Sequence, residues 1–425
     1  MDNIDTKLSS LGCTLQFWHK KKISLVVGGG IAAYRVLDLI RGLKAQGAEV
    51  TVIGTEAATR FVTPLTFHAI SGHPFYGDLF HPGEEGGMDH IRLAREADLV
   101  IVAPATADLM AKMAHGLAND LATAMILARR GPLLVAPAMN VAMWEHPATQ
   151  RNVERLKGDG LVFCGPEAGA LACGEEGMGR LAGVDTILEA ARRCLENKTL
   201  VGKHFLLTAG PTREELDPVR YLSNHSSGKM GWAIAQAALR AGAQVTLVHG
   251  PVHLPPLWGA KMVPVTSACD MFAAVMDCWE TCQPSRSLDA IILTAAVADF
   301  RPVVRSSEKI KKTSSMIPMN IELEANPDIL LELGRRHGAM ENHQRPILVG
   351  FAAETGRAVE RGREKLARKP CDLLVVNDLM EEGAGFMVDT NRVTLLDRDG
   401  LEETWPLMSK DAVGARLVEA VAARF

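Results

Sequence analysis

The sequence predicts an α/β protein built from two doubly wound, Rossmann-like domains. The first observation is a repeated layout, in which a basic start, an apolar strand and a glycine turn occur in KISLVVGGG (22–30) and again in GKHFLLTAG (202–210). The second is that an apolar helical pattern and a near-identical phrase follow each copy, AQGAEVTVIGT (45–55) and RAGAQVTLVHG (240–250). The third is that further short apolar runs alternate with helical patterns in both halves, which is typical of parallel sheets.

Short apolar runs that end in Pro, Gly, Ala, Asn or Asp mark the expected buried strands. These runs lie within 22–30, 50–53, 99–104, 133–138 and 161–166 of the first half, and at 204–208, 245–248, 290–297, 347–353 and 373–378 of the second. Gly47 and Gly242 are expected to end the first helix of each half. The Asp399–Gly400 turn predicts a last hairpin within 386–405.

A short polar connector, ENKTLVGK (196–203), separates the two halves. We therefore expect an N-terminal extension over 1–20, a first domain over 21–196 and a second domain over 197–425.

Composition excludes several classes of function. The 425 residues carry a formal net charge of −4, which argues against a general nucleic-acid or membrane-surface binder. Apolar residues make up 47% of the chain, but no uninterrupted apolar stretch is long enough to span a bilayer. Eight scattered cysteines do not form a disulfide framework, so we expect a reducing, cytoplasmic location.

The most informative segment is the loop AGPTREELDPVRYLSNHSSGKMG (209–231). It connects the strand 204–208 to an apolar helix pattern at 232–242, a place where helix N-terminal N–H groups hold phosphates. Gly210 and Gly242 are 32 residues apart, whereas Gly28 and Gly47 are 19 apart, so the second copy is 13 residues longer. The additional residues are rich in hydrogen-bond donors that a solvated turn would not need.

This loop resembles the nucleotide and phosphopantothenate loop of bacterial phosphopantothenate–cysteine ligases, which form the second half of a bifunctional enzyme family of coenzyme A synthesis. The resemblance implies ligation of 4′-phosphopantothenate with cysteine through an acyl-cytidylate, with release of CMP and diphosphate and with Mg²⁺ accompanying CTP. It implies catalytic roles for Asn224 and Lys309. It also implies a nucleotide site lined by Ala296, Asp299, Lys309, Asn326, Pro327, Asp328, Ile329, Phe351, Lys365 and Lys369.

Two local patterns in the second half predict a helix start and a pair of lysines on one helix face. ANPDIL (325–330) reads as a helix start with Asn326 as N-cap. Lys365 and Lys369 are spaced to share one helix face, although a solvated face would show the same spacing. The residues alone do not choose between CTP and ATP, and no carboxylate cluster identifies metal ligands.

Four segments of the first half lie at expected strand ends or beside them. They are GGGIAAYR (28–35), APATADLMAKMAHGLANDL (103–121), PAMN (137–140) and ACGEEGMGR (172–180). A glycine cluster alone is a weak signal. The pairing of PAMN with ACGEEGMGR is more specific, because ordinary strand ends require neither segment.

Together these four segments resemble the flavin-dependent cysteine decarboxylases, specifically phosphopantothenoylcysteine decarboxylase. The resemblance implies a flavodoxin-like domain that converts 4′-phosphopantothenoylcysteine to 4′-phosphopantetheine and CO₂. It implies that His90 acts beside the flavin, Asn140 holds the substrate carboxylate and Cys173 donates a proton. It implies FMN contacts from Gly30, Ile31, Ala32, Thr55, Ala105, Thr106 and Asp108.

Two other functions are compatible with parts of the sequence. A nicotinamide oxidoreductase fits the fold but leaves Asn140, Cys173 and the long loop unexplained, and the sequence lacks GxGxxG. A non-catalytic regulatory relative would typically have lost His90 or Cys173, and both are present.

The resemblance further implies small-molecule partners only (4′-phosphopantothenate, cysteine and CTP) and a homo-oligomer built from trimers that can combine into dodecamers.

Overall fold

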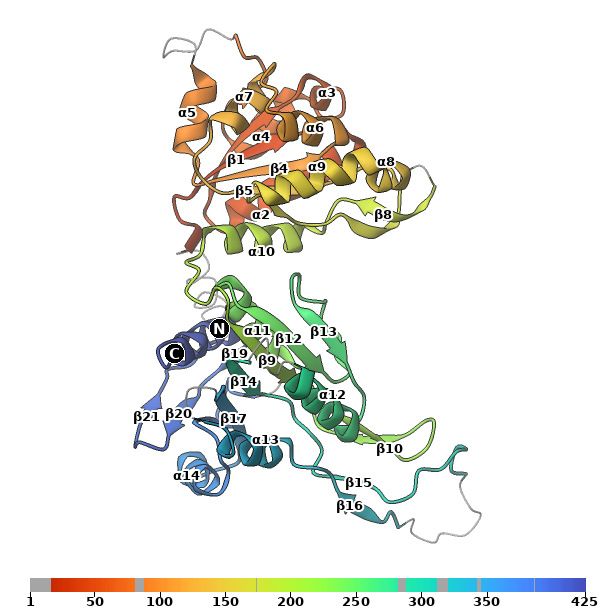
Figure 1. Cartoon of the computed structure of the whole chain (residues 1–425), viewed down its shortest axis with the longest axis vertical. Coiled ribbons are helices and arrows are strands. Elements are labelled where there is room, and N and C mark those ends of the chain that lie inside the picture. Colours follow the sequence, from red (N-terminus) through yellow and green to blue (C-terminus); the bar gives the residue numbers. More distant parts are fainter. Residues whose placement is uncertain are drawn as a thin grey trace. The chain divides into compact units, whose positions relative to one another are not determined.

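A computed structural model describes residues 17–80, 88–172, 174–281, 288–311, 320–341, 345–385 and 387–425 (Figure 1). The chain divides after Glu196 into two compact units. The first unit begins earlier than the sequence predicted, because Trp18 is fully buried and the Arg192 guanidinium lies 5.0 Å from the centre of the Phe17 ring. The rest of the predicted extension, residues 1–16, lies outside the described residues.

A six-stranded, fully parallel sheet forms the centre of the first unit, in the order β3-β2-β1-β4-β5-β6. The strands are β1 (Lys22–Val27), β2 (Glu49–Gly54), β3 (Phe75–Tyr76), β4 (Leu99–Ala105), β5 (Leu133–Pro137) and β6 (Val162–Phe163). Every residue of β4 is buried, as expected for a strand covered on both faces. The sequence predicted each strand except the two-residue edge strand β3. Without β3, the order is that of flavodoxin-like sheets.

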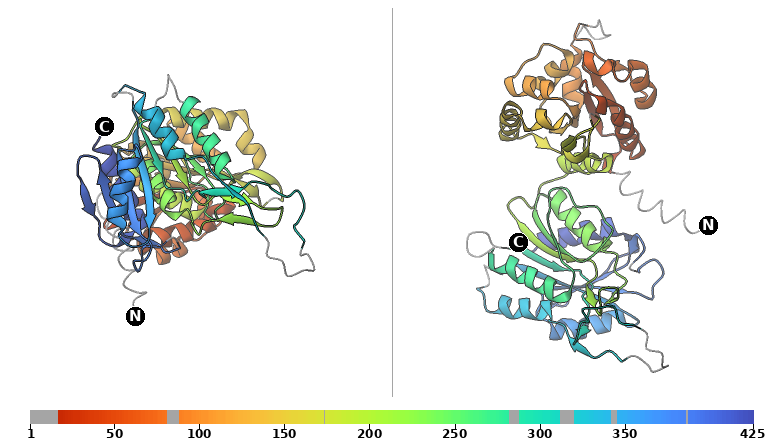
Figure 2. Two further views of the ribbon diagram at one scale, coloured as in Figure 1. Left: turned by 90° about the horizontal axis from the view of Figure 1, so that it is seen from below. Right: turned by 90° about the vertical axis from the view of Figure 1, so that its right-hand side faces the viewer.

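Helices cover both faces of this sheet (Figure 2). On one face, α2 (Val36–Ala45) and α10 (Val184–Leu195) pack against each other and against the strands. On the other face, four helices form one apolar cluster with the strands: α5 (Asp89–Glu96), α6 (Ala107–His115), α7 (Leu121–Ala128) and α9 (Pro147–Gly158). The remaining elements are η1 (Ile31–Arg35), α3 (Glu56–Thr59), α4 (Pro64–Ser71), α8 (Val141–Glu145) and the hairpin β7 (Glu167–Ala170)–β8 (Glu176–Arg180).

The second unit contains an eight-stranded sheet in the order β13-β12-β9-β14-β17-β18-β20-β21. The strands are β9 (His204–Ala209), β12 (Gln244–His249), β13 (Lys261–Pro264), β14 (Ala290–Leu293), β17 (Ile347–Glu354), β18 (Leu373–Asp378), β20 (Thr394–Asp397) and β21 (Glu402–Thr404). The first six are parallel and the last two are antiparallel. The predicted hairpin is confirmed, since β20 pairs with β21 across a turn in which Gly400 has a φ of 102°.

The helices of the second unit also cover both faces of its sheet (Figure 1). On one face, α11 (Lys229–Arg240) and α15 (Lys410–Ala422) pack together in one apolar cluster. On the other, α12 (Ala268–Thr281), α13 (Ile329–Gly338) and α14 (Ala358–Arg368) contribute to a second cluster. None of the described helices is long and apolar enough to cross a membrane.

The two units share one plan, which confirms the predicted doubly wound architecture. The chain reverses its direction of winding between β1 and β4 and again between β9 and β14. In such sheets, ligands bind beyond the carboxyl ends of the strands at this reversal. Gly47 and Gly242 follow α2 and α11 with φ values of 96° and 94°, the left-handed conformation expected at helix ends.

The longer crossover of the second unit is partly ordered by its own hairpin. Its strands, β10 (Arg213–Glu215) and β11 (Tyr221–Ser223), are antiparallel. Two further short pairs flank the sheet: β15 (Phe300–Pro302) with β16 (Leu323–Ala325), and β19 (Thr390–Asn391) with β22 (Met408–Ser409).

Candidate active sites

A cavity of about 660 Å³ lies at the carboxyl ends of β1 and β5 in the first unit. This is within the usual size of a small-molecule or cofactor site. Its wall combines the glycine turn, the segment after β5 and the β7–β8 hairpin. The lining residues are Gly30, Ile31, Ala32, Tyr34, Arg35, Ala138, Met139, Asn140, Ala170, Leu171, Ala172, Gly179, Arg180 and Leu181.

The glycine turn brings the ends of β1 and β4 into direct contact. The Gly28 N–H donates to the Pro104 carbonyl at 3.1 Å, and a methyl group on Gly28 would lie 2.5 Å from that oxygen. A methyl group on Gly30 would meet only Thr106 Cγ2, at 3.7 Å. The turn therefore forms an open cavity wall, made by Gly30, Ile31 and Ala32, that a planar cofactor can approach.

The other predicted cofactor residues do not line this cavity. The hydroxyls of Thr55 and Thr106 accept from the backbone N–H groups of Ala58 and Leu109 as N-caps of α3 and α6. Ala105 is buried, and Asp108 is exposed and forms an ion pair with Lys112. Thr106 and Thr55 both lie beside the glycine turn, since Thr55 Oγ1 donates to the carbonyl of Val27 at 3.4 Å. The Ala105 carbonyl accepts from the N–H of Ala138, which lines the cavity, whereas the ion pair of Asp108 is local.

Asn140 enters the cavity from the start of α8. Its side-chain oxygen accepts from the Ala142 N–H at 2.8 Å, and its Nδ2 donates to the Glu175 carboxylate at 2.7 Å. The β7–β8 hairpin is held to the same segment, because the Met139 N–H donates to the Gly179 carbonyl at 2.9 Å. Cys173 lies outside the described residues.

His90 lies in a different cavity of about 490 Å³, together with Leu79, Phe80, Ile91, Ala118, Ala124, Leu127 and Ala128. This cavity shares no lining residue with the one that contains Asn140. Among the described residues, His90 Nδ1 is buried without a hydrogen-bond partner. The structure of one chain therefore does not bring His90 and Asn140 together in one cavity.

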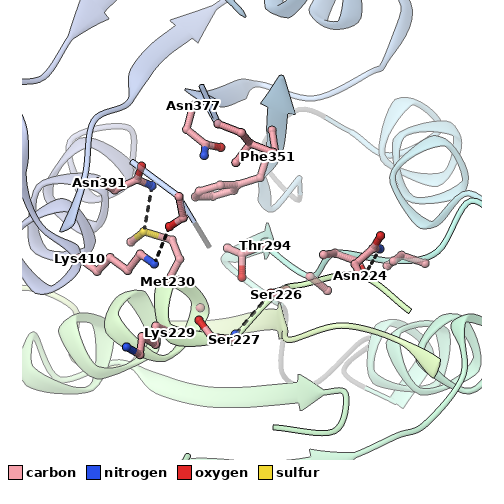
Figure 3. A pocket seen from close by; sticks show the side chains of 18 residues that line it. Asn224, Ser226, Ser227, Lys229, Met230, Thr294, Phe351, Asn377, Asn391 and Lys410 are labelled. Atoms are coloured by element: carbon pink, nitrogen blue, oxygen red, sulfur yellow. Dashed lines mark hydrogen bonds between the residues drawn. The ribbon is translucent and has the colours of Figure 1, made fainter. Parts of the chain in front are cut away.

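In the second unit, a cavity of about 430 Å³ lies where the sheet reverses between β9 and β14 (Figure 3). Three predicted residues, Asn224, Ala296 and Phe351, line it. The other lining residues are Ser226, Ser227, Gly228, Lys229, Met230, Gly231, Thr294, Ala295, Val297, Ala353, Asn377, Leu379, Gly385, Asn391 and Lys410.

The polar loop places Asn224 and the first turn of α11 on the cavity wall. Asn224 Nδ2 donates to the Ala296 carbonyl at 2.8 Å, which fixes the amide at the end of β14. Gly228 precedes α11 with a φ of 78°. A methyl group on Gly231 would lie 2.4 Å from the Ala209 side chain, so glycine allows α11 to approach β9 closely. The unpaired N–H groups of this first turn can bind an anion.

Two lysines lie at the opposite end of this cavity from Asn224 (Figure 3). Lys229 pairs with Asp389 at 2.6 Å. Lys410 is only 7% exposed and donates to the carbonyls of Gly385 and Val388. Burial, followed by the charge of Lys229, lowers the pKa of Lys410 to about 8, against an opposing effect of Asp389.

Sequence reasoning missed Lys410, Asn377 and Asn391. Asn377 is the penultimate residue of the predicted strand 373–378, so the rule that ligands gather at strand ends could have identified it. A lysine in the first turn of an amphipathic helix is ordinarily exposed, so no local signal marked Lys410.

The remaining predicted nucleotide residues lie around the loop that follows β14, and two local predictions were wrong. The N-cap of α13 is Asp328, whose carboxylate accepts from the Leu331 N–H, and Asn326 instead donates to the Ala298 carbonyl at 2.8 Å. Lys369 is not on the face of α14, because the helix ends at Arg368.

Of these residues, Asn326 contacts the loop after β14, and the lysines contact neighbouring segments. Lys369 forms an ion pair with Asp328, and Lys365 Nζ donates to the Phe351 carbonyl at 3.4 Å. The Asp299 carbonyl accepts from the Asn326 N–H at 2.8 Å. Pro327 is half-buried and Ile329 is buried, and neither lines the cavity.

Lys309 is exposed and does not line the cavity, but its segment is attached to the polar loop. The Ile310 N–H donates to the Asp217 carboxylate at 3.1 Å, and Arg220 donates to the Ile310 carbonyl. Burial raises the pKa of Asp217, but hydrogen bonds from three backbone N–H groups and the Arg220 charge hold it below its ordinary value. Asp217 is therefore an ionised anchor between the two segments.

The described residues contain no group of three or more His, Cys, Asp or Glu side chains that could hold a metal ion.

Comparison with known proteins covers nearly the whole chain. A family model described as "Flavoprotein" matches residues 15–196, and one described as "DNA/pantothenate metabolism flavoprotein C-terminal domain" matches residues 200–425. The coenzyme A biosynthesis bifunctional protein CoaBC of Vibrio vulnificus is 46% identical over 401 residues, which cover 94% of this chain and 97% of the relative. The protein of the same name from Bacillus subtilis is 45% identical over 409 residues, covering 95% and 97%.

A solved structure of the C-terminal domain of a CoaBC protein is 36% identical and covers 54% of this chain and 98% of that chain, with a TM-score of 0.43. The two family models and the full-length relatives agree on one assignment. The chain belongs to the family of bifunctional CoaBC proteins of coenzyme A biosynthesis.

Proposed function

We propose that the chain carries out two consecutive reactions. The second unit ligates 4′-phosphopantothenate with cysteine at the expense of CTP, and the first unit decarboxylates the resulting 4′-phosphopantothenoylcysteine to 4′-phosphopantetheine and CO₂. One observation supports this proposal most strongly. Each unit has a cavity beside the point where its sheet reverses, and predicted site residues are among those that line it.

The ligase site needs to activate a carboxylate and to stabilise negative charge. The carboxylate attacks the α-phosphorus of CTP and diphosphate leaves; the cysteine amine then attacks the acyl carbon and CMP leaves. Asn224 holds one N–H on the Ala296 carbonyl, and its amide carries a second N–H that can stabilise the oxyanion at the acyl carbon. The first turn of α11, with Lys229, balances phosphate charge.

The nucleotide is placed along the loop after β14. Phe351 lies on the cavity wall, Lys365 brings positive charge beside it, and Lys369 is paired with Asp328 in a neighbouring segment. Lys309 approaches from the segment anchored by Asp217. Mg²⁺ accompanies the triphosphate, and because the described residues form no carboxylate cluster, we assign no step to it.

The decarboxylase site fits FMN on the open glycine turn, where Gly30 has no side chain to block a planar ring. FMN, when bound, would accept two electrons on oxidation of the substrate thiol, which would allow the neighbouring carboxylate to leave as CO₂, and would return them to the resulting enethiol to give 4′-phosphopantetheine. Asn140 donates to that carboxylate from the start of α8. Cys173 holds the proton that completes the product, and His90 orients the reacting thiol.

Within the described residues of one chain, His90 and Asn140 line separate cavities, which favours a decarboxylase site completed by a second copy of the chain. Phe80 is 86% exposed and Leu127 is 60% exposed beside His90, an apolar surface suited to a subunit contact. From the family resemblance we propose that the copies form a homo-oligomer built from trimers, which can combine into dodecamers, and from the scattered cysteines a cytoplasmic location. Mixing inactive His90→Asn and Asn140→Asp chains should restore decarboxylation if the site is shared, and no recovery after subunit exchange would contradict it.

The ligase assignment is tested by omitting cysteine. Purified protein given 4′-phosphopantothenate, CTP and magnesium should release diphosphate and accumulate an acyl-cytidylate that mass spectrometry detects. Addition of cysteine should then release CMP. Formation of diphosphate without 4′-phosphopantothenate, or of an acyl phosphate with CDP, would contradict the proposed chemistry.

A further inference from the structure

The contact between Asn140 and Glu175 places a carboxylate of the chain on the amide that is assigned to the substrate carboxylate. Glu175 Oε2 accepts from Asn140 Nδ2 at 2.7 Å. The orientation of this amide is defined, because its oxygen accepts from the Ala142 N–H at 2.8 Å. The nitrogen of Asn140, and not its oxygen, therefore faces Glu175.

Backbone contacts hold Glu175 in this position. It lies in the turn of the β7–β8 hairpin, where its carbonyl accepts from the Leu171 N–H at 2.9 Å. Strand β8 lies directly against the segment that carries Asn140: methyl groups on Gly177 and Gly179 would lie 2.9 Å from Val141 and 2.2 Å from the Met139 carbonyl oxygen. The hairpin backbone thus places the exposed Glu175 side chain within reach of Asn140.

We propose that Glu175 is a positioning residue that occupies the place of the substrate carboxylate and must be displaced before substrate binds. This inference rests on the proposed function, in which Asn140 holds that carboxylate. Both N–H groups of the Asn140 amide are on one nitrogen. A substrate carboxylate bound to that nitrogen would therefore lie close to the Glu175 carboxylate, and their like charges would repel each other.

The same contact favours release of the product. Decarboxylation removes the group that competes with Glu175 for Asn140, so Glu175 returns to the amide once CO₂ has left. Glu175 thereby weakens the binding of the acid and leaves the binding of the decarboxylated product unaffected. Its carboxylate also keeps the Asn140 amide correctly oriented while the site is empty.

The test measures equilibrium binding to the full-length, FMN-loaded protein and needs no turnover. The first probe is 4′-phosphopantothenoylserine, which keeps the carboxylate but has a hydroxyl in place of the thiol. The second is the ethanolamine amide of 4′-phosphopantothenate, which has the same skeleton without the carboxylate. Glu175→Gln removes the charge and keeps an acceptor for Asn140, and Glu176→Gln is the matched control on the adjacent exposed residue.

We expect Glu175→Gln to tighten binding of the serine probe at least fivefold, with the ethanolamine probe and the Glu176→Gln control each within twofold of wild type. Unchanged or weaker binding of the serine probe, or equal tightening of both probes, would overturn the inference while leaving the proposed function intact. If neither probe binds the wild-type protein, the proposed decarboxylase function fails and the inference fails with it.

Discussion

Replacement of Lys410 with methionine should change how the stability of the second unit depends on pH. Lys410 is 7% exposed, and its pKa is about 8 in the folded protein against an ordinary 10.5. Between these pH values the unfolded chain binds more protons than the folded chain, so the free energy of unfolding of the wild-type protein rises with pH. Methionine has a similar length and no titrating group, so Lys410→Met should lack this rise.

The difference between a pKa of 10.5 and one of about 8 corresponds to roughly 3 kcal/mol, at about 1.4 kcal/mol per pH unit. Below the folded pKa, Lys410 is charged in both states and this penalty is present in full. It is relieved as the pH rises through about 8 towards 10.5. Between pH 7 and pH 9 the wild-type protein should gain about 1 kcal/mol relative to Lys410→Met.

The assay should report on the second unit within the full chain. Cys278 and Cys371 are both buried there, so their alkylation in urea, quantified by peptide mass spectrometry, measures unfolding of this unit. Wild type and variant are compared at each pH, which removes the pH dependence of thiol reactivity. Lys261→Met, at an exposed position that begins β13, is the control. Parallel stability profiles for wild type and Lys410→Met from pH 7 to pH 9 would refute the depressed pKa.

Three further predictions concern the two active sites. Asn224→Asp cannot donate the oxyanion hydrogen bond and should lower ligation by about 10²- to 10³-fold while decarboxylation of supplied 4′-phosphopantothenoylcysteine continues; loss of both activities in a folded variant would argue against separate sites. Gly179→Ala should lower the melting temperature and decarboxylation, because its methyl group would lie 2.2 Å from the Met139 carbonyl oxygen, whereas Gly158→Ala has open space and should preserve both. Cys173→Ser should stop at the oxidised enethiol, so a normal yield of 4′-phosphopantetheine would exclude its role as proton donor.

The parts of the fold that could be predicted are those specified by local sequence. Buried parallel strands appear as short apolar runs, as in β4, and the last hairpin is marked by the turn at Gly400. Because parallel strands end at the same edge of a sheet, residues that follow different strands converge there. Asn224, Ala296 and Phe351, which the family resemblance selected, come from separate segments at this edge and line one cavity.

The parts that could not be predicted depend on contacts between distant segments. Asn326 and Asp328 are equally good helix caps by type, and the bond from Asn326 to the Ala298 carbonyl decides between them. The burial of Lys410 depends on carbonyl groups more than 20 residues earlier in the chain. The position of His90 could not be predicted either. The motif that contains His90 does not show that this residue lines a different cavity from Asn140.

The most direct test of two linked reactions is mass spectrometry of the products formed by the purified full-length protein from 4′-phosphopantothenate, cysteine, CTP and magnesium. We expect 4′-phosphopantetheine together with CMP and CO₂. Accumulation of 4′-phosphopantothenoylcysteine by FMN-loaded protein would contradict the decarboxylase assignment of the first unit. The absence of any product, with ATP as well as with CTP, would contradict the account as a whole.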